Sequence, residues 1–347
     1  MSNGTVHALS LENVTTYLRV ANQLRPVIIR IELRLERGEI VGLVGESGSG
    51  KSMTARTISG VLPDGAVTEG ALRLGAENLF EMPHRRRREV QAKEIGIVWQ
   101  DPKAYIDPLW RIEVHVTEAM RVHLGLSKSE ARTRAIDLLA SVGIDQPERR
   151  MHQFPHELSG GMLQRVMIAG ALSVGPSVLL ADEVTTALDV TTQAEIVKLL
   201  GRLRTERGLT VLFITHDLAL ADVVCDRVCV MYAGRIVEAR QGRGIFEDPL
   251  HPYTIELLAA RPTIDRRVDR LPVIKGVPTS AMEAPPGCAF HPRCRFAIDA
   301  CRDGVPAPVP VQGGFVCCIR AHEVRQTTPP APSGAGVTTW EGNAASS

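Results

Sequence analysis

Eight consecutive residues, Gly45 to Ser52, have the composition of a loop that binds phosphate groups. They read Gly-Glu-Ser-Gly-Ser-Gly-Lys-Ser, and they lie between a short apolar strand, Glu39–Val44, and a helical segment, Ser52–Gly60. Glycine permits a backbone that aims N–H groups at phosphate oxygens, and the helix N-terminus adds a positive dipole. Lys51 then places a charge at the terminal phosphates, and the Ser52 hydroxyl binds Mg²⁺. We expect the nucleotide to contact the loop and the residue after it: Gly45, Glu46, Ser47, Gly48, Ser49, Gly50, Lys51, Ser52 and Met53.

Two acids end a second apolar segment, Val178–Glu183. A buried parallel strand delivers such residues to its carboxyl edge, where ligands bind in sheets of this kind. Asp182 is expected to hold Mg²⁺ through water, and Glu183 to polarise the water that attacks the γ-phosphate. The pair alone is common, but its position about 130 residues after the loop makes it a strong indication of nucleotide hydrolysis.

Two single polar residues follow other strands at the same predicted edge. Gln100 comes after Ile95–Trp99, and His216 comes after Val211–Thr215. A lone residue of either type after a strand is usually a cap or a surface group. Because both are expected beside Asp182 and Glu183, each is a candidate sensor of the γ-phosphate.

A second anion site is indicated at Ser159-Gly160-Gly161, which opens a helical segment. Ser before glycines at a helix start exposes N–H groups and a positive dipole. An ordinary helix cap would have the same residues. Two such helix starts in one chain suggest that one serves the chain's own nucleotide and the other a partner's.

The elements that position these residues follow from hydrophobic periodicity. Alternating patterns at Leu9–Val20 and Val27–Leu35 predict an antiparallel sheet, and residues 101–172 predict a helical insert made of Ile112–Leu124, Lys128–Val142 and Gly161–Leu172. Buried strands then alternate with helices, which predicts a parallel sheet. The later elements are expected at Ser177–Ala181, Thr191–Arg207, Thr210–Thr215, Arg235–Ala239 and Pro252–Ala260. We therefore expect an α/β domain over residues 1–260, a Cys-rich extension over 261–325 and a disordered tail over 326–347.

Composition narrows the class of protein. The 347 residues carry 40 basic and 39 acidic side chains, a net charge of +1, which argues against a partner held by nucleic-acid phosphates. No window approaches the roughly 18–20 apolar residues that span a bilayer. Residues 1–19 lack the pattern of a secretory signal. We expect a chain in the cytosol that reaches a membrane only through partners.

Taken in order, the loop at Gly45–Ser52, Gln100, Ser159-Gly160-Gly161, Asp182-Glu183 and His216 resemble an ABC-transporter ATPase from about residue 9 to 260. The resemblance implies a P-loop NTPase ABC cassette: a RecA-like parallel core, an antiparallel β subdomain and a helical insert. It also implies a head-to-tail dimer with two ATP molecules between the subunits. Ala187-Leu188-Asp189 extends the resemblance, and Asp189 would lie at the dimer seam. Gln100 would bind Mg²⁺ and link hydrolysis to the membrane subunits.

Four further stretches are similar to the dipeptide/oligopeptide (and nickel) importer ATPases: Gln100-Asp-Pro, Ser159–Ala169, Thr185–Val190 and His251-Pro-Tyr-Thr254. The loop and Met162 look like the first, D-type, of the two ATPase subunits in such systems. The resemblance implies a heterodimer with a second ATPase, two transmembrane permeases and an extracytoplasmic solute-binding protein. It places the chain peripherally on the cytoplasmic face of the membrane. Peptide, nickel or another small solute remains open as the cargo.

Five cysteines gather near the end of the chain: Cys288, Cys294, Cys301, Cys317 and Cys318. This region is similar to the family's C-terminal extension, which is associated with a [4Fe–4S] cluster. Four thiolates also suit a structural zinc, although the Cys-x2-Cys pairs of zinc ribbons are missing. Alignment on the preceding valine favours Cys318 as the fourth ligand after Cys288, Cys294 and Cys301, with Cys317 as the alternative. Cys225 and Cys229 are more simply buried small residues.

The sequence departs from the family at several positions. Val184 replaces the usual Pro, which should alter the turn after Glu183. Residues 103–108 read Lys-Ala-Tyr-Ile-Asp-Pro, where the family more usually has Ser-Leu-Asn-Pro. The aromatic expected on adenine is Tyr17, but Leu18 could occupy that position. A soluble ABC ATPase of DNA repair or translation is the main alternative, although the chain has neither a long coiled-coil insertion nor a second cassette. A non-hydrolysing switch is disfavoured because Glu183 and His216 are both present.

Overall fold

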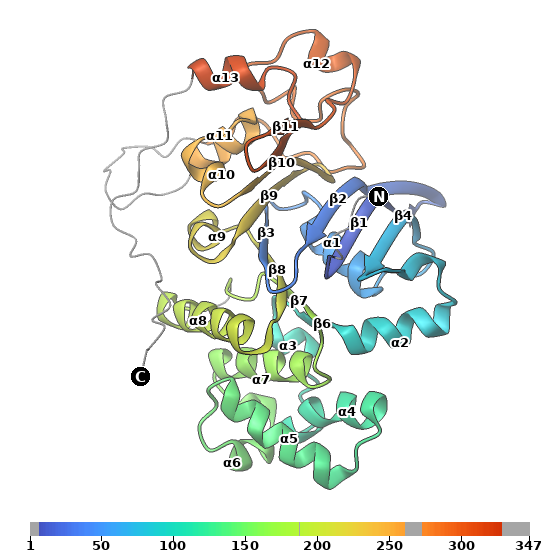
Figure 1. The fold of residues 1–347 in the computed structure, drawn as a ribbon, viewed down its shortest axis with the longest axis vertical. Coiled ribbons are helices and arrows are strands. Elements are labelled where there is room, and N and C mark those ends of the chain that lie inside the picture. Colours follow the sequence, from blue (N-terminus) through green and yellow to red (C-terminus); the bar gives the residue numbers. More distant parts are fainter. Residues whose placement is uncertain (1–6, 187, 261–272, 328–347) are drawn as a thin grey trace, which may run out of the picture.

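The computed structural model describes residues 7–186, 188–260 and 273–327. In these residues, an eight-stranded sheet runs in the order β11-β12-β10-β9-β3-β8-β7-β6 through the middle of the molecule (Figure 1). Its five parallel strands are β3 (Ile40–Val44), β6 (Ile95–Val98), β7 (Val178–Asp182), β8 (Thr210–Thr215) and β9 (Arg227–Tyr232). Every residue of β3, β7 and β8 is buried, as expected for strands covered on both faces. The predicted parallel core is confirmed.

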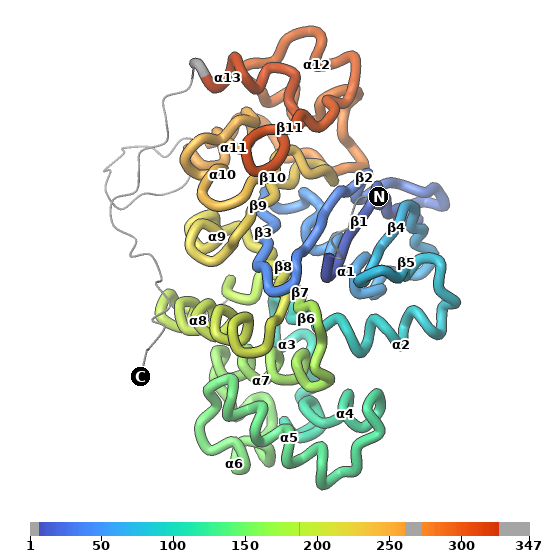
Figure 2. Tube along the Cα trace, viewed as in Figure 1, coloured from blue at the N-terminus to red at the C-terminus, as the bar shows by residue number. Residues whose placement is uncertain are grey.

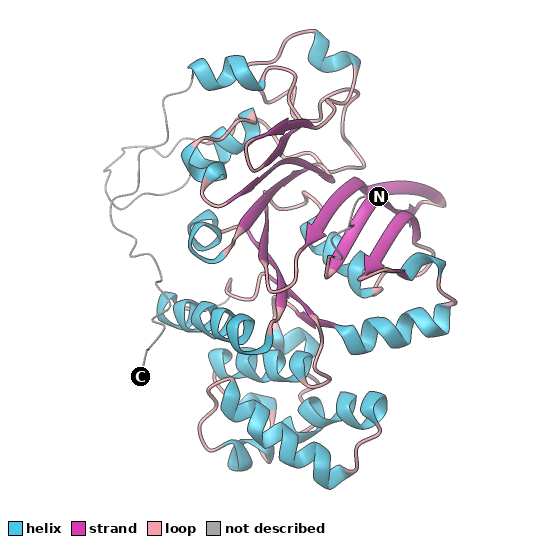
Figure 3. Cartoon of the chain, viewed as in Figure 1, coloured by secondary structure: helices cyan, strands magenta, loops and turns pink. Residues whose placement is uncertain are grey.

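Helices cover this sheet on both faces (Figure 3). Alternate residues of β8 enter different hydrophobic clusters: Val211 and Phe213 on one side, Leu212 and Ile214 on the other. This follows from the period of two in a strand. The helices that flank the parallel strands are α1 (Lys51–Ser59), α7 (Gly160–Leu172), α8 (Val190–Arg207) and α9 (Leu218–Val224).

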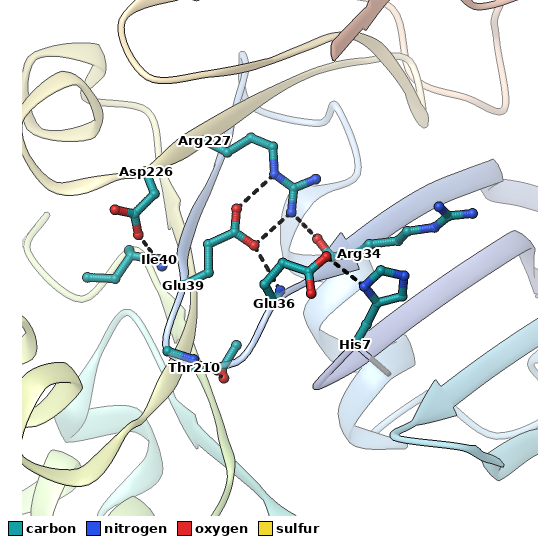
Figure 4. A network of polar contacts seen from close by, with 9 residues as sticks. His7, Arg34, Glu36, Glu39, Ile40, Thr210, Asp226 and Arg227 are labelled. Atoms are coloured by element: carbon teal, nitrogen blue, oxygen red, sulfur yellow. Dashed lines mark hydrogen bonds and ion pairs between the residues drawn. The ribbon is translucent and has the colours of Figure 1, made fainter. Parts of the chain in front are cut away.

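The predicted antiparallel sheet is present, with the order β2-β1-β4-β5. It contains β1 (Leu9–Val20), β2 (Gln23–Leu35), β4 (Val67–Leu74) and β5 (Glu77–Asn78). A polar network ties it to the core sheet (Figure 4). Arg227 donates to both carboxylate oxygens of Glu39 at 2.9 Å and to the carbonyl of Arg34. The two sheets therefore form one body around the start of β3.

The helical insert lies at one end of the molecule, and the Cys-rich extension lies at the other (Figure 2). The insert matches the predicted helices to within a residue at most ends; α5, for example, begins at Lys128 after a capping box between Ser127 and Glu130. Its elements are α3 (Pro102–Tyr105), α4 (Ile112–Leu124), α5 (Lys128–Ser141), α6 (Pro147–Met151), η2 (Pro155–Glu157) and α7. Between the antiparallel sheet and β6 lie η1 (Leu79–Glu81) and α2 (His84–Glu94).

The Cys-rich extension adds strands to the core sheet. β11 (Val309–Val311) and β12 (Gly314–Val316) form a hairpin, and β12 pairs with β10 (Arg235–Gln241) through Glu238 and Val316. The other elements of this end are α10 (Gly244–Glu247), α11 (Pro252–Ala259), α12 (Ala300–Asp303) and α13 (Ala321–Thr327). The predicted boundary at residue 261 falls outside the described residues. The predicted tail, 326–347, begins within α13, which ends at Thr327, and residues 328–347 lie outside the described residues.

Candidate nucleotide-binding site

The loop between β3 and α1 has a backbone that only glycine adopts readily. Gly45, Gly48 and Gly50 have φ angles of 154°, 78° and 109°. A Cβ on Gly45 would also lie 2.3 Å from the carbonyl oxygen of Met231. The loop is therefore shaped by close approach to β9 as well as by its turn, and its N–H groups stand at the start of α1.

Lys51, the first residue of α1, folds back over this loop. Its Nζ donates to the carbonyls of Gly45 at 2.9 Å and Glu46 at 3.0 Å, and the residue is only 5% exposed. Burial lowers the pKa of Lys51, while the carboxylates of Glu183, Asp182 and Glu46 oppose that shift. The ammonium thus lies in a setting where added negative charge is favourable.

Asp182 at the end of β7 meets Ser52 of α1. The Ser52 hydroxyl donates to Oδ1 of Asp182 at 3.0 Å, and Asp182 is 4% exposed. Burial raises the pKa of Asp182, and the bond from Ser52 partly offsets it. The Ser52 hydroxyl and the buried Asp182 carboxylate are two oxygen ligands of the kind that Mg²⁺ prefers.

Three strand ends bring polar groups together at Glu183. Its Oε2 accepts from Gln100 Nε2 at 2.9 Å and from Thr186 Oγ1 at 3.3 Å, and His216 Nδ1 lies 3.4 Å away. Gln100 follows β6, Glu183 follows β7 and His216 follows β8, as the sequence predicted. Glu183 also has a φ of 49°, a left-handed conformation that costs energy in a non-glycine residue. Val184 after it is buried in the core, at 2% exposed.

The second predicted anion site is exposed. Ser159 caps α7 and its Oγ accepts from Met162 N at 3.3 Å. Asp189 caps α8, accepting from the backbone N of Thr192 at 3.0 Å and from its hydroxyl at 2.7 Å. A Cβ on Gly161 would lie 2.8 Å from Thr192 Cγ2, so the starts of α7 and α8 are in contact. Gly160 is exposed as well, and Ala187 lies outside the described residues.

Tyr17 lies on β1, opposite Pro26 of β2 and Val67 of β4. Its hydroxyl donates to Glu69 Oε2 at 3.3 Å. Tyr17 and Leu18 are both partly exposed. The adenine contact therefore stays a prediction for either residue.

Four cysteines line one small cavity: Cys288, Cys294, Cys301 and Cys318. Burial raises the pKa of Cys294 to about 11 and that of Cys318 to about 12. Cys317 does not line it; its thiol donates to the carbonyl of Ile236 at 3.6 Å. Within the described ranges, no three His, Cys, Asp or Glu side chains are placed to hold a metal ion. Cys229 is 1% exposed in the core, as predicted for a small buried residue.

Two residues that hold the phosphate loop were not assigned this role by sequence reasoning. The backbone N of Glu46 donates to the hydroxyl of Tyr253 at 2.8 Å, and Arg293 binds the Glu46 carboxylate. They lie 207 and 247 residues away from Glu46 along the chain. Tyr253 belongs to the His-Pro-Tyr-Thr stretch and Arg293 precedes Cys294. In the sequence, only their membership of these two motifs marks Tyr253 and Arg293 as candidate functional residues.

None of the helices in the described part of the chain has the length and hydrophobicity needed to span a bilayer.

Comparisons with known proteins agree with this geometry. The ABC transporter family model matches residues 28–186, and the model for the oligopeptide/dipeptide transporter C-terminal region matches residues 237–301. The chain is 43% identical over 279 residues to the dipeptide transport ATP-binding protein DppD of Escherichia coli, covering 80% of this chain and 85% of that protein. It is 40% identical over 301 residues to the oligopeptide transport ATP-binding protein AppD of Bacillus subtilis, covering 86% and 92%.

Solved structures show the same fold. The dimeric bacterial ABC transporter cassette MJ0796 superposes with a TM-score of 0.61 at 29% identity, covering 68% of this chain and 99% of that one. Both of these relatives and both family models point to the same group of proteins. The chain belongs to the ABC transporter family as an ATP-binding subunit of the oligopeptide/dipeptide importers, an ATPase that energises peptide transport.

Proposed function

We propose that ATP is bound by the loop Gly45–Ser52 and hydrolysed by the groups that converge on Glu183. The observation that carries this proposal is the meeting of Gln100, Glu183 and His216 beside the Ser52–Asp182 pair. Ser52, Asp182 and Gln100 would hold Mg²⁺, which would supply positive charge to the phosphates of the nucleotide. Lys51 leaves the loop carbonyls for the terminal phosphates.

Glu183 acts as the general base in this mechanism. Its carboxylate accepts the proton of the attacking water, while Gln100 and His216 orient the water and the γ-phosphate. The hydrogen bond from Gln100 at 2.9 Å keeps the carboxylate turned toward this group. In this mechanism, the side chains speed hydrolysis by positioning the attacking water and by stabilising charge on the γ-phosphate.

Replacing Glu183 with Gln tests this assignment. We expect E183Q to lose steady-state hydrolysis by two orders of magnitude or more, because an amide does not accept the proton, and to retain ATP binding. The control is E206Q, which changes a side chain that is 59% exposed on α8. Turnover of E183Q equal to that of E206Q would remove Glu183 from the role of base.

The exposed starts of α7 and α8 complete the nucleotide site of a second ATPase subunit. Ser159, Gly160 and Gly161 present N–H groups to a partner's ATP, and Asp189 lies at the seam. Exposure of both helix starts in the single chain supports this arrangement. We expect E183Q with ATP and Mg²⁺ to dimerise in size-exclusion chromatography only with the second ATPase subunit. Introducing S159R should abolish that dimer, and a homodimer of this chain would contradict a heterodimer.

A groove beside α4 is the proposed contact with the two permeases. It is lined by Leu109, Trp110 and Val122, which are 80%, 56% and 67% exposed, together with charged residues such as Arg121. Exposed apolar side chains gathered in a hollow mark a protein interface. Docking here places the subunit peripherally at the cytoplasmic face, with the solute-binding protein acting through the permeases.

The cysteine cavity is proposed to hold a [4Fe–4S] cluster in the extension that spans 261–325. The extension lacks the Cys-x2-Cys pairs that are common in zinc ribbons, which favours the cluster over a structural zinc. Four thiols around one cavity match its ligand number. Bound there, the cluster would fasten the extension together.

The cluster is tested by anaerobic purification with iron and sulfide analysis. We expect a brown protein with about four irons per chain. C318S should lose iron, and C317S is the matched control, because Cys317 points to Ile236 instead. A colourless protein with one zinc per chain would reverse the assignment.

A further inference from the structure

Arg293 of the Cys-rich extension reaches into the phosphate loop. Its Nη1 and Nη2 donate to the two carboxylate oxygens of Glu46 at 2.7 and 3.0 Å. Such a bidentate pair is the strongest geometry available to Arg and a carboxylate. Glu46 is the second residue of the loop, so an element 247 residues later in the chain contacts the nucleotide site directly.

The Arg293 side chain is itself fixed in place. It is 4% exposed, and its guanidinium lies 5.8 Å from the ring centres of both Tyr232 and Phe290. Nε donates to Lys275 O at 2.9 Å, Nη1 also approaches the hydroxyl of Tyr232 at 3.4 Å, and Nη2 approaches Ile274 O at 3.5 Å. Its donors are all directed at acceptors, as a buried guanidinium requires. The cation therefore cannot leave Glu46 without losing several contacts.

Glu46 carries its charge in an unfavourable position for a phosphate loop. The Glu46 carbonyl accepts from Lys51 Nζ at 3.0 Å. The Glu46 carboxylate is therefore on a residue that contacts the lysine expected to bind phosphate. The side chain is 20% exposed, where water screens charge poorly. Without a cation beside it, this carboxylate would repel the polyphosphate of ATP.

We propose that Arg293 is a positioning residue for ATP binding, which neutralises Glu46 and thereby makes nucleotide affinity depend on the Cys-rich extension. This inference rests on the proposed role of Gly45–Ser52 as the ATP phosphate site. The extension is then part of the nucleotide site and not only an appendage to the cassette. Both Nη atoms of Arg293 donate to Glu46, so we expect Arg293 to act through Glu46 and not on the nucleotide itself.

The test is fluorescent-ATP binding to the full-length chain with paired variants. R293Q should weaken ATP about tenfold, which corresponds to about 1.4 kcal/mol. R293Q/E46Q should recover to within about threefold of wild type, because removing the negative charge removes the repulsion. The ATP affinity of R293K should lie between those of wild type and R293Q, since lysine keeps the charge but not the bidentate geometry of the guanidinium. A residue that served only packing would not be rescued by E46Q.

R295Q is the matched control, because Arg295 lies on the other side of Cys294 and pairs with Glu256 while 59% exposed. It should bind ATP like wild type. R293Q at wild-type affinity, or R293Q/E46Q as weak as R293Q, overturns the inference. If R293Q alone does not fold, the ATP affinity of R293Q/E46Q decides. An affinity near that of wild type supports the proposal about Arg293, and a tenfold loss of affinity overturns it. The proposal that Gly45–Ser52 binds the phosphates of ATP is tested separately by K51M, and it is wrong if K51M binds ATP as tightly as wild type.

Discussion

The hydroxyl of Tyr253 is expected to stabilise the phosphate loop by a single hydrogen bond. Tyr253 is fully buried, and its hydroxyl accepts from the backbone N of Glu46 at 2.8 Å. The Y253F substitution removes this acceptor but keeps the ring, which packs 4.6 Å from Tyr232 and 5.3 Å from Phe290 between centres. The change therefore isolates one polar contact from its apolar surroundings.

The size of the stability change follows from the loss of the hydrogen-bond acceptor for the backbone N–H of Glu46. A partly buried N–H left without an acceptor costs about 1–3 kcal/mol, and the retained ring adds little to that cost. We expect the free energy of unfolding to fall by about 2 kcal/mol, and ATP affinity to fall because the loop is less ordered.

Urea unfolding followed by far-UV circular dichroism measures the first effect, and fluorescent-ATP titration measures the second. The control is Y105F, since Tyr105 is 49% exposed and accepts only a surface bond from Arg56 at 3.3 Å. Y105F should change stability by less than about 0.5 kcal/mol. If Y253F unfolds at the same urea concentration as Y105F, the reasoning about the Glu46 N–H is wrong.

Three further predictions concern other residues. Burial raises the pKa of Glu238 from 4.5 to about 7, so its folded form keeps a proton that the unfolded form releases. Stability should therefore fall as pH rises from about 4.5 to about 7, and E238Q should lack this slope in urea titrations at several pH values. G45A should abolish fluorescent-ATP binding, because the added Cβ lies 2.3 Å from the carbonyl oxygen of Met231. W110A should stop peptide uptake by the reconstituted importer while leaving the turnover of the isolated subunit unchanged, since Trp110 is 56% exposed in the proposed permease groove.

Sequence reasoning was most successful where local pattern dictates structure. The phosphate loop, its flanking strand and helix, and the strand ends that carry Gln100, Glu183 and His216 follow from periodicity and from the geometry of parallel sheets. The sequence therefore predicted which residues meet at Glu183, now joined by contacts of 2.9 and 3.4 Å.

Contacts between distant segments were not accessible in this way. Nothing in the spacing of residues 309–316 indicates that this hairpin extends the core sheet beside β10. The pairing of Arg293 with Glu46 depends on how the extension packs against Tyr232 and Phe290, which is a tertiary property. The left-handed φ of 49° at Glu183 also has no signal in residue type, because glutamate seldom adopts it.

The long separation between Glu46 and Arg293 has a consequence for synthesis of the chain. At about 5–20 residues per second, a ribosome adds the 247 residues between them in about 12–50 s. During that interval the loop and its strand can form, but the Glu46 charge has no partner. If Arg293 neutralises Glu46 as proposed, a nascent cassette has weaker affinity for ATP until the extension has emerged and folded. Late completion of this kind would favour ATP binding by finished subunits over unfinished ones.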